Sequence, residues 1–427
     1  MKFSFKHHGL TAIAVTWISS IAMADHPNQG DQTLELLSST AISNSLELKA
    51  LDQEIESLKM QERASFGSFA PIISIEAGPQ YSDIAGQKNS GTAIYGKAEW
   101  NLYRGGKDQI EGKIASENAA GLARQRTALE NRIRADVAEA FYEMQFAAES
   151  VALKKEALVL NGEQQKSALS KNKAGFTAKS DVLEFDLREA TILSDILLAD
   201  QALSHSVRKM STLIGRDQSD SGLRIKGHLE RRSRLELNRA TLAQGLLVNN
   251  LELQKAQTLQ NTLALEMRKE RSAYYPKLDF ETRYGKLGNA ERVNPDNGDL
   301  TMLLKISIPV FSGLNTTNRV SALAATSRAK GFDTDLDKAH LLEELDVLIS
   351  AVDAIQKRLD VEEKNLQRSR DYYDATMSEY RKGLKNSPDM VTASERVLEA
   401  KIRNLEFRRD LSVAMARISK LTGVSLK

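Results

Sequence analysis

The sequence predicts a mainly helical protein that carries two β-hairpins of membrane type and consists of two similar halves. Only 41% of the 427 residues are hydrophobic and 6% are aromatic, a composition that favours elongated helices over a thick globular core. Long segments place apolar residues at alternating spacings of three and four, which is typical of helices that pack along their length. Two other regions alternate apolar and charged residues with period two, the pattern of half-buried strands.

The first 24 residues differ from the rest of the chain. Lys2 and Lys6 precede an apolar run over residues 10–22, and Ala22-Met23-Ala24 follows at its end. This pattern predicts a secretory signal peptide, residues 1–24, with a mature chain that begins at Asp25. An N-terminal membrane anchor is the alternative, but the apolar run is short for a bilayer span. The chain has no cysteine, which excludes disulfides, thiolate metal sites and a catalytic thiol.

Two halves of the chain repeat each other at a nearly constant offset. Four pairs of identical residues lie 208 positions apart: Gly105 and Gly313, Gly175 and Gly383, Asp181 and Asp389, Gly215 and Gly423. Upstream of these, Pro71 and Pro276 differ by 205, so the second half has three additional residues between its Pro and its Gly. The offsets predict a first structural repeat over 25–220 and a second over 221–427.

Each repeat contains one predicted β-hairpin, at 71–103 and at 276–311. The expected strands are 71–81, 92–103, 276–287 and 299–311, joined by turn-rich loops at 82–91 and 285–298. Because a lone two-stranded ribbon is marginal in water, the hairpins must close with other strands. Strands of this length with one apolar and one charged face match an outer-membrane barrel, and a small soluble sandwich is the alternative.

The remaining segments are predicted helices. The longest are 106–174 and 314–382, each on the order of 100 Å at ~1.5 Å per residue, and shorter ones cover 31–66, 179–214, 233–272 and 388–422. Two turns interrupt them, "NKAGFTAKSDV" at 172–182 and "RKGLKNSPDMV" at 381–391. Gly383 suits a helix C-cap, and Ser387, Pro388 and Asp389 suit an N-cap and a first turn. The order in each repeat is helix, hairpin, long helix, turn, helix.

This arrangement resembles the TolC-like outer-membrane efflux channel family over essentially the whole mature chain. The most specific marks are the strand-to-helix junctions "WNLYRGG" at 100–106 and "IPVFSG" at 308–313, together with the two turns at 172–181 and 380–389. The resemblance implies a TolC-like trimeric channel, in which three chains share a twelve-stranded outer-membrane β-barrel that continues as a long α-helical barrel through the periplasm.

The resemblance also implies a periplasmic gate at the two turns. Asp389 would contribute to a ring of carboxylates at the tunnel entrance, where like charges repel and attract cations. Hydrogen bonds of Tyr380 with Asp181, and of Lys385 with Ser180, would hold the entrance closed. Without the family context, the two aspartates are equally well interpreted as helix caps, Tyr380 as packing at a helix end and Lys385 as a solvated side chain.

Other positions at the turns complete the expectation. The tip glycines, Gly175 and Gly383, mark the turns on which an adaptor would dock. A second ring carboxylate expected three residues after Asp389 is Thr392 here, so the ring carries less negative charge. Lys385 stands where the best-known family member has an arginine, which removes a bidentate bond.

The function that follows from the resemblance is a passive exit duct of a tripartite efflux or type I secretion system. Its expected partners are two further copies of the chain, a periplasmic adaptor (membrane fusion) protein, an inner-membrane pump of RND or ABC type, and outer-membrane lipid. The alternative is a periplasmic coiled-coil adaptor or scaffold protein. That class would need a compact lipoyl-like domain and only one helix hairpin per chain.

Composition and motifs argue against other functions. Outside the signal peptide, 59 − 2 = 57 basic residues face 57 acidic ones, so no basic face suits nucleic acid. The six histidines have no ligand spacing, which predicts neither a metal site nor a metalloenzyme. The glycine pair at 105–106 lacks the rest of a phosphate loop. We therefore expect no enzyme activity and no cofactor.

Overall fold

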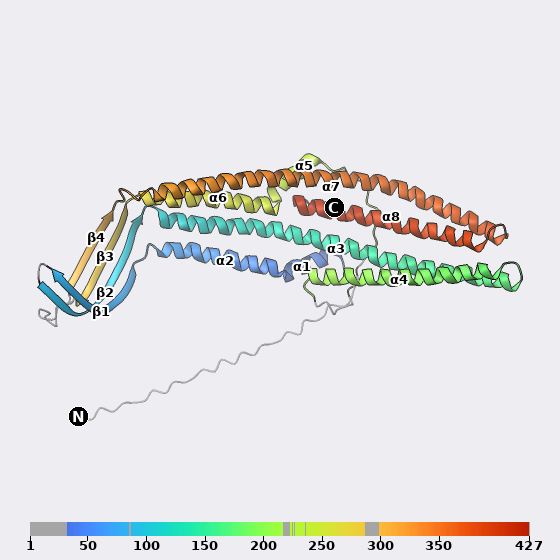
Figure 1. Ribbon diagram of the computed structural model, residues 1–427, viewed down its shortest axis with the longest axis horizontal. Helices are drawn as coiled ribbons and strands as arrows, with labels where there is room; N and C mark the ends of the chain where they lie inside the picture. Colours follow the sequence, from blue (N-terminus) through green and yellow to red (C-terminus); the bar gives the residue numbers. More distant parts are fainter. Residues whose placement is uncertain are drawn as a thin grey trace, which may run out of the picture.

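The computed structural model is a long, narrow molecule with a β-sheet at one end and two helix hairpins at the other (Figure 1). It describes residues 32–84, 87–216, 223, 225, 227–234, 236–286 and 299–426. The predicted signal peptide, the boundary between the repeats at 220 and 221, and most of the loop at 285–298 lie outside these residues. Among the helices of these segments, none is long and apolar enough to cross a membrane.

Four strands form one antiparallel sheet in the order β1-β2-β3-β4. Their bounds are β1 Ile72–Ile84, β2 Gln87–Arg104, β3 Lys277–Lys286 and β4 Asp299–Ser307. The first hairpin is longer than expected, since pairing continues through the predicted loop 82–91 to Ile84 and Gln87. The polar residues of that segment keep their backbone donors and so can remain in the ladder. Strand β4 ends before 311 because Pro309 cannot donate a ladder hydrogen bond.

The two faces of the sheet differ in chemistry. One face carries an ionic network in which Lys97 lies 3.4 Å from Glu76 and also pairs with Glu99. The opposite face leaves large apolar side chains open to the surroundings, for example Ile75 with 82% of its surface exposed and Ile306 with 64%. The predicted alternation is therefore confirmed, and the apolar face lacks a partner within the described part of the chain.

The long helices form one curved layer. Their bounds are α3 Lys107–Lys173, α4 Lys179–Leu213, α7 Asn315–Arg381 and α8 Ser387–Thr422, each within one residue of its expected ends. Contacts between α4 and α3, α3 and α8, and α8 and α7 give the order α4-α3-α8-α7 across the layer. Helices α3 and α7 each have 67 residues, and their starts differ by 315 − 107 = 208 positions.

The shorter helices are interrupted where single helices were expected. The segment 31–66 forms α1 Leu34–Asn44 and α2 Leu46–Gly67, and 233–272 forms α5 Arg239–Asn249 and α6 Leu251–Arg271, followed by the 3₁₀ turn η1 Ser272–Tyr274. The Ser45 hydroxyl accepts from the Leu48 amide at 3.2 Å, and the Asn250 side chain accepts from the Glu252 amide at 3.0 Å. At each break, the side-chain oxygen takes the place of the backbone carbonyl that would accept this amide in a continuous helix, and it caps the start of a new helix.

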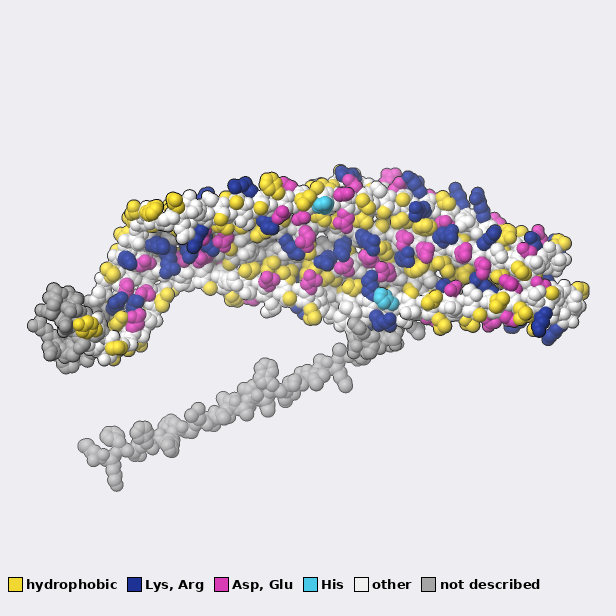
Figure 2. All heavy atoms as spheres, viewed as in Figure 1, with side chains coloured by type: hydrophobic (Ala, Val, Ile, Leu, Met, Phe, Trp, Pro, Cys, Tyr) yellow, Lys and Arg dark blue, Asp and Glu magenta, His cyan; other side chains and the backbone are white. Residues whose placement is uncertain are grey.

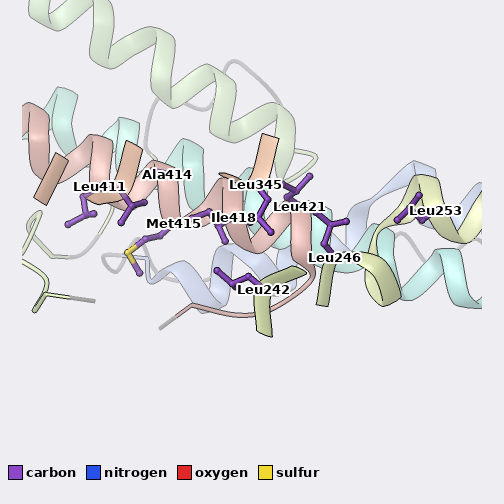
Figure 3. Packing of buried hydrophobic residues seen from close by; sticks show 10 residues of the cluster. Leu242, Leu246, Leu253, Leu345, Leu411, Ala414, Met415, Ile418 and Leu421 are labelled. Atoms are coloured by element: carbon purple, nitrogen blue, oxygen red, sulfur yellow. The ribbon is translucent and has the colours of Figure 1, made fainter. Parts of the chain in front are cut away.

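Two apolar cores lie at mid-height of the layer and repeat each other. One joins α1, α3 and α4, and the other joins α5, α6, α7 and α8 around Leu345, Ile418 and Leu421 (Figure 3). Equivalent core residues keep the sequence offsets of 205 before the hairpin and 208 after it: Leu37 and Leu242, Ala41 and Leu246, Val137 and Leu345, Met144 and Val352, Met210 and Ile418. The internal repeat is thus visible in the packing.

Basic and acidic side chains are interspersed along the helical body (Figure 2). Many form ion pairs between neighbouring helices. Arg417 of α8 pairs with Glu139 of α3 at 2.7 Å, and Lys420 pairs with Asp136 at 2.8 Å. Such exposed pairs each contribute roughly 0–1 kcal/mol, so the apolar cores contribute most to holding the layer together.

Candidate functional site: the helix-hairpin tips

Both hairpin turns use the same backbone device. Gly175 has φ of +73° and Gly383 has φ of +75°, values that side chains with a Cβ rarely adopt. After each glycine, the chain closes a Schellman-type turn: the Phe176 amide donates to the Lys171 carbonyl at 2.9 Å, and the Leu384 amide donates to the Glu379 carbonyl at 3.0 Å. Nothing lies within 4 Å of a Cβ built on either glycine, so the requirement for glycine is conformational.

The second turn leads into α8 through a capping box. Asn386, rather than the expected Ser387, is the N-cap, and its side chain accepts from the Asp389 amide at 3.2 Å. The Asp389 carboxylate in return accepts from the Asn386 amide at 3.4 Å and lies 3.7 Å from the Lys385 ammonium. The interpretation of Asp389 as a cap is therefore correct for this chain. Its carboxylate remains about one-third exposed, so capping still leaves it accessible to solvent.

The first turn is built with fewer side-chain bonds. Ala178 is the N-cap of α4 and makes no side-chain capping bond. Asp181 lies in the first helical turn, where a negative charge is favourable to the helix dipole, and it is half-buried. Ser180 is exposed. The two aspartates related by the repeat thus occupy equivalent positions but have different local partners.

A small apolar cluster joins the two hairpins just behind the turns. Its buried members come from α3, α4, α7 and α8: Ala168, Phe185, Tyr380, Met390 and Val391. Phe185 and Met390 have no exposed surface, and Tyr380 is 3% exposed. Because each helix of both hairpins contributes a side chain, the tips cannot separate without opening this core.

Lys171 of α3 binds the end of α7 on the other hairpin. Its Nζ atom donates to the Tyr380 carbonyl at 2.7 Å and lies 3.7 Å from the centre of the Tyr380 ring. Burial lowers the pKa of the Lys171 ammonium below its ordinary value. One heptad earlier, the Gln164 amide donates to the Tyr373 hydroxyl at 3.2 Å, and burial raises the pKa of that phenol. These two contacts connect α3 to α7 across the tip.

The hydrogen bonds expected at the gate are not formed in this structure. The Tyr380 hydroxyl is buried and has no partner among the described residues, so it does not bond to Asp181. Lys385 pairs with Asp389 of its own turn instead of with Ser180. The cation that reaches Tyr380 from the other hairpin is Lys171, which sequence reasoning missed. The sequence does contain a pattern that could have indicated these contacts. Gln164 and Lys171 are seven residues apart, as are Tyr373 and Tyr380, so each pair lies on one side of its helix.

Charged pairs reinforce the join between the hairpins further from the turns. Arg188 of α4 lies 2.7 Å from Glu395 of α8, and Lys401 of α8 lies 2.9 Å from Glu156 of α3.

At the turns themselves, Phe176 and Leu384 leave 82% and 73% of their surfaces exposed. In the described part of the chain, no group of three or more acidic, histidine or cysteine side chains could hold a metal ion. The site therefore combines a closed apolar join with an exposed apolar residue at each turn.

Comparison with known proteins agrees with this architecture. A family model described as outer membrane efflux protein matches residues 242–424. The chain is 19% identical to the outer membrane protein TolC of Vibrio cholerae serotype O1 over 398 residues, which cover 88% of each protein. This similarity extends across both repeats, although the family model matches only the second.

Solved structures are similar over the same extent. The CmeC outer membrane channel of Campylobacter jejuni gives a TM-score of 0.76 at 14% identity and covers 99% of this chain and 94% of its own. The open state of the MtrE outer membrane channel of Neisseria gonorrhoeae gives 0.76 at 15% identity, with 92% and 89% covered. With the duplicated helices and the four-stranded sheet, these matches show a TolC-like channel fold, and the family model assigns residues 242–424 to the outer membrane efflux proteins.

Proposed function

We propose that three copies of this chain form a passive exit duct of a tripartite efflux or type I secretion system, gated at the hairpin tips. As a TolC-like efflux channel, the protein lies in the outer membrane and extends into the periplasm. The observation that carries the proposal is that, among the residues that the structure describes, both edges of the helical layer and both edges of the sheet are open. An open layer encloses no tunnel, so further copies must complete it.

Both edge helices present apolar side chains away from their own neighbours. On α4 the buried residues Phe185 and Ile192 face α3, whereas Leu187 and Leu197 are 68% and 71% exposed on the opposite side. On α7 the face opposite the buried stripe carries Val361, which is 62% exposed. Exposed apolar side chains on the two free edges can pack against each other. A second copy is therefore the occupant that fits, with α4 of one chain against α7 of the next.

The sheet supports the same assembly. Strands β1 and β4 each have one neighbour, so each leaves a row of backbone donors and acceptors unpaired. The exposed apolar face suits lipid, and the face with Glu76 and Lys97 suits an aqueous lumen. Three sheets of four strands close one barrel and remove all free edges.

The tips are the proposed gate and docking surface. Asp389 and Asp181 would line the entrance, Tyr380 would lie in the join that keeps it closed, and Lys385 and Ser180 would flank the turns. Gly175 and Gly383 hold the turns that a periplasmic adaptor would contact, with energy supplied by an inner-membrane pump. The exposed Phe176 and Leu384 support an apolar contact at this end.

The alternative, a periplasmic adaptor or coiled-coil scaffold, does not fit the architecture. The chain contains two long helix hairpins, and its four-stranded sheet exposes an apolar face. An adaptor would present a single hairpin and a compact β domain with a closed core.

Disulfide cross-linking between copies tests the assembly directly, because the natural chain has no cysteine. Leu197 and Val361 each lie roughly 30 Å from the tips at ~1.5 Å per residue, so Leu197→Cys with Val361→Cys should cross-link under oxidation into a covalent trimer. Leu197→Cys combined with Ile192→Cys, which faces the chain's own α3, is the matched control and should not. A band that stops at dimer, or no cross-link in carbonate-washed outer membranes, would contradict the trimer.

A further inference from the structure

The face of α8 that carries Asp389 also carries two arginines. Arg396 and Arg403 follow Asp389 at intervals of seven residues, which places all three side chains along one side of the helix. At ~1.5 Å per residue, they lie roughly 10 and 20 Å further from the turn. If Asp389 lines the entrance as proposed above, the wall immediately behind it is cationic.

These arginines line a groove between α7 and α8. The groove has a volume of about 300 Å³ and also includes Arg368 and Tyr372 of α7. The Arg396 guanidinium lies 5.0 Å from the centre of the Tyr372 ring. Arg403 lies 3.8 Å from Glu362, and Glu399 also borders the groove. Arg368 and Arg396 have no carboxylate within 4.0 Å among the described residues.

The residue equivalent to Arg396 in the first repeat has a different environment. Arg188 is the equivalent of Arg396, at 396 − 208 = 188, and it pairs with Glu395 at 2.7 Å with only 12% of its side chain exposed. Arg188 is therefore neutralised and covered, whereas Arg396 is exposed and stacked on an aromatic ring. Three guanidinium groups against two carboxylates leave one excess positive charge in each copy of the groove.

The groove lies on the side of α7 that faces away from the connecting segment 227–234. Arg231 of that segment pairs with Asp360 at 2.7 Å and with Glu363, both on α7. Tyr372 is twelve residues beyond Asp360, which turns its side chain by about 120° around the helix. A segment that crosses the helical layer at mid-height would obstruct a tunnel from within, so it belongs on the outside. The groove then faces the lumen.

We propose that this arginine groove is a luminal site for solutes that carry carboxylate or phosphate groups. Arginine presents paired N–H donors that match the two oxygens of such groups, and two unpaired guanidiniums beside an aromatic ring form a receptive surface. Three copies around the axis would make a cationic zone behind the acidic entrance. The site selects for anionic cargo that the entrance ring alone would disfavour. This inference rests on the proposed duct and on its inner face.

Block of ion current by citrate tests the site. Wild-type protein is reconstituted in planar bilayers in potassium chloride, and citrate is added on the side of the hairpin tips. We expect Arg396→Gln with Arg403→Gln to raise the half-blocking citrate concentration at least tenfold. Arg396→Lys with Arg403→Lys keeps the charge but loses the paired donors, and should give an intermediate value. Arg370→Gln is the matched control, because Arg370 is seven residues from Glu363 on the outer face and should change the value less than twofold.

The outcomes separate the site from the duct. The arginine groove would be wrong, and the duct would stand, in either of two cases. Citrate could block wild type and the Arg396 and Arg403 double variant equally, or the control substitution could weaken the block as much as the double variant does. Absence of current from folded wild-type trimers would overturn the duct and the luminal site together. Equal current in all variants before citrate is added shows that the substitutions leave the trimer intact.

Discussion

Replacing Lys171 with methionine should loosen the join between the two hairpins. Methionine keeps most of the aliphatic packing but removes the donor to the Tyr380 carbonyl at 2.7 Å and the cation over the Tyr380 ring at 3.7 Å. The carbonyl still accepts from the Gly383 amide at 3.1 Å, so the substitution leaves no orphaned acceptor. The change therefore reports on the bridge between hairpins and not on the turn itself.

The magnitude follows from three opposing effects. A hydrogen bond from a charged donor contributes ~1.5–3 kcal/mol, and a cation over an aromatic ring contributes ~0.5–2 kcal/mol. Burial, which lowers the pKa of Lys171, and partial solvent screening offset part of this gain. We expect a net loss of roughly 1–2 kcal/mol in the free energy of opening the tip, which corresponds to about 5- to 30-fold more frequent opening.

Amide hydrogen exchange of the trimer, read on peptides that cover residues 376–390, measures this opening. Lys171→Met should speed exchange there by 5- to 30-fold at constant pH. Tyr380→Phe is the control: it keeps the ring and the carbonyl and removes only a buried hydroxyl without a partner, so exchange should stay equal or slow. Faster exchange in Tyr380→Phe with no change in Lys171→Met would refute the reasoning. That result would restore the hydroxyl bond expected from the sequence.

Four further substitutions have expected outcomes. Phe185→Ala removes a side chain with no exposed surface and should destabilise the tip by about 3–5 kcal/mol, seen as a lower thermal midpoint, whereas Phe176→Ala, 82% exposed, should leave the midpoint nearly unchanged. Gly383→Ala forces a Cβ into φ of +75° and should cost ~1–2 kcal/mol, with an unchanged midpoint contradicting the strain. The hydrogen bond from Arg239 holds the pKa of Asp346 below its ordinary value, so its contribution is present at neutral pH and lost as pH falls through that lowered pKa. Wild type should therefore exceed Asp346→Asn in thermal midpoint at pH 7 and lose that advantage in acid; a constant difference would argue against the linkage.

Periodicity predicted the large elements because their determinants are local and repeated. The long helices began and ended within one residue of expectation, since glycine turns and heptad patterns fix both ends. The breaks at Ser45 and Asn250 were missed because each depends on one capping side chain inside an otherwise helical pattern. The extension of the first hairpin was missed because backbone pairing does not require strand-type side chains.

The candidate site was less predictable from the sequence. Positions such as Gly175 and Gly383 follow from local backbone demands, and both turns lie where they were expected. The partners of Tyr380 and Lys385 depend on which side chains of four helices meet at the tip, which no single segment specifies. Lys171 lies in the last turn of α3, a common place for a basic residue, and has no motif of its own. The roles of Asp389, Asp181 and Ser180 in gating stay predictions.

Single-channel conductance of the purified protein in planar bilayers tests the central claim most directly. If three chains form a gated duct, wild type should give discrete, uniform current steps, and Asp389→Ala should lower the preference for cations without abolishing them. Correctly folded trimers that give no steps, or steps whose ion selectivity is unchanged in Asp389→Ala, would contradict a duct with its entrance at the second hairpin turn.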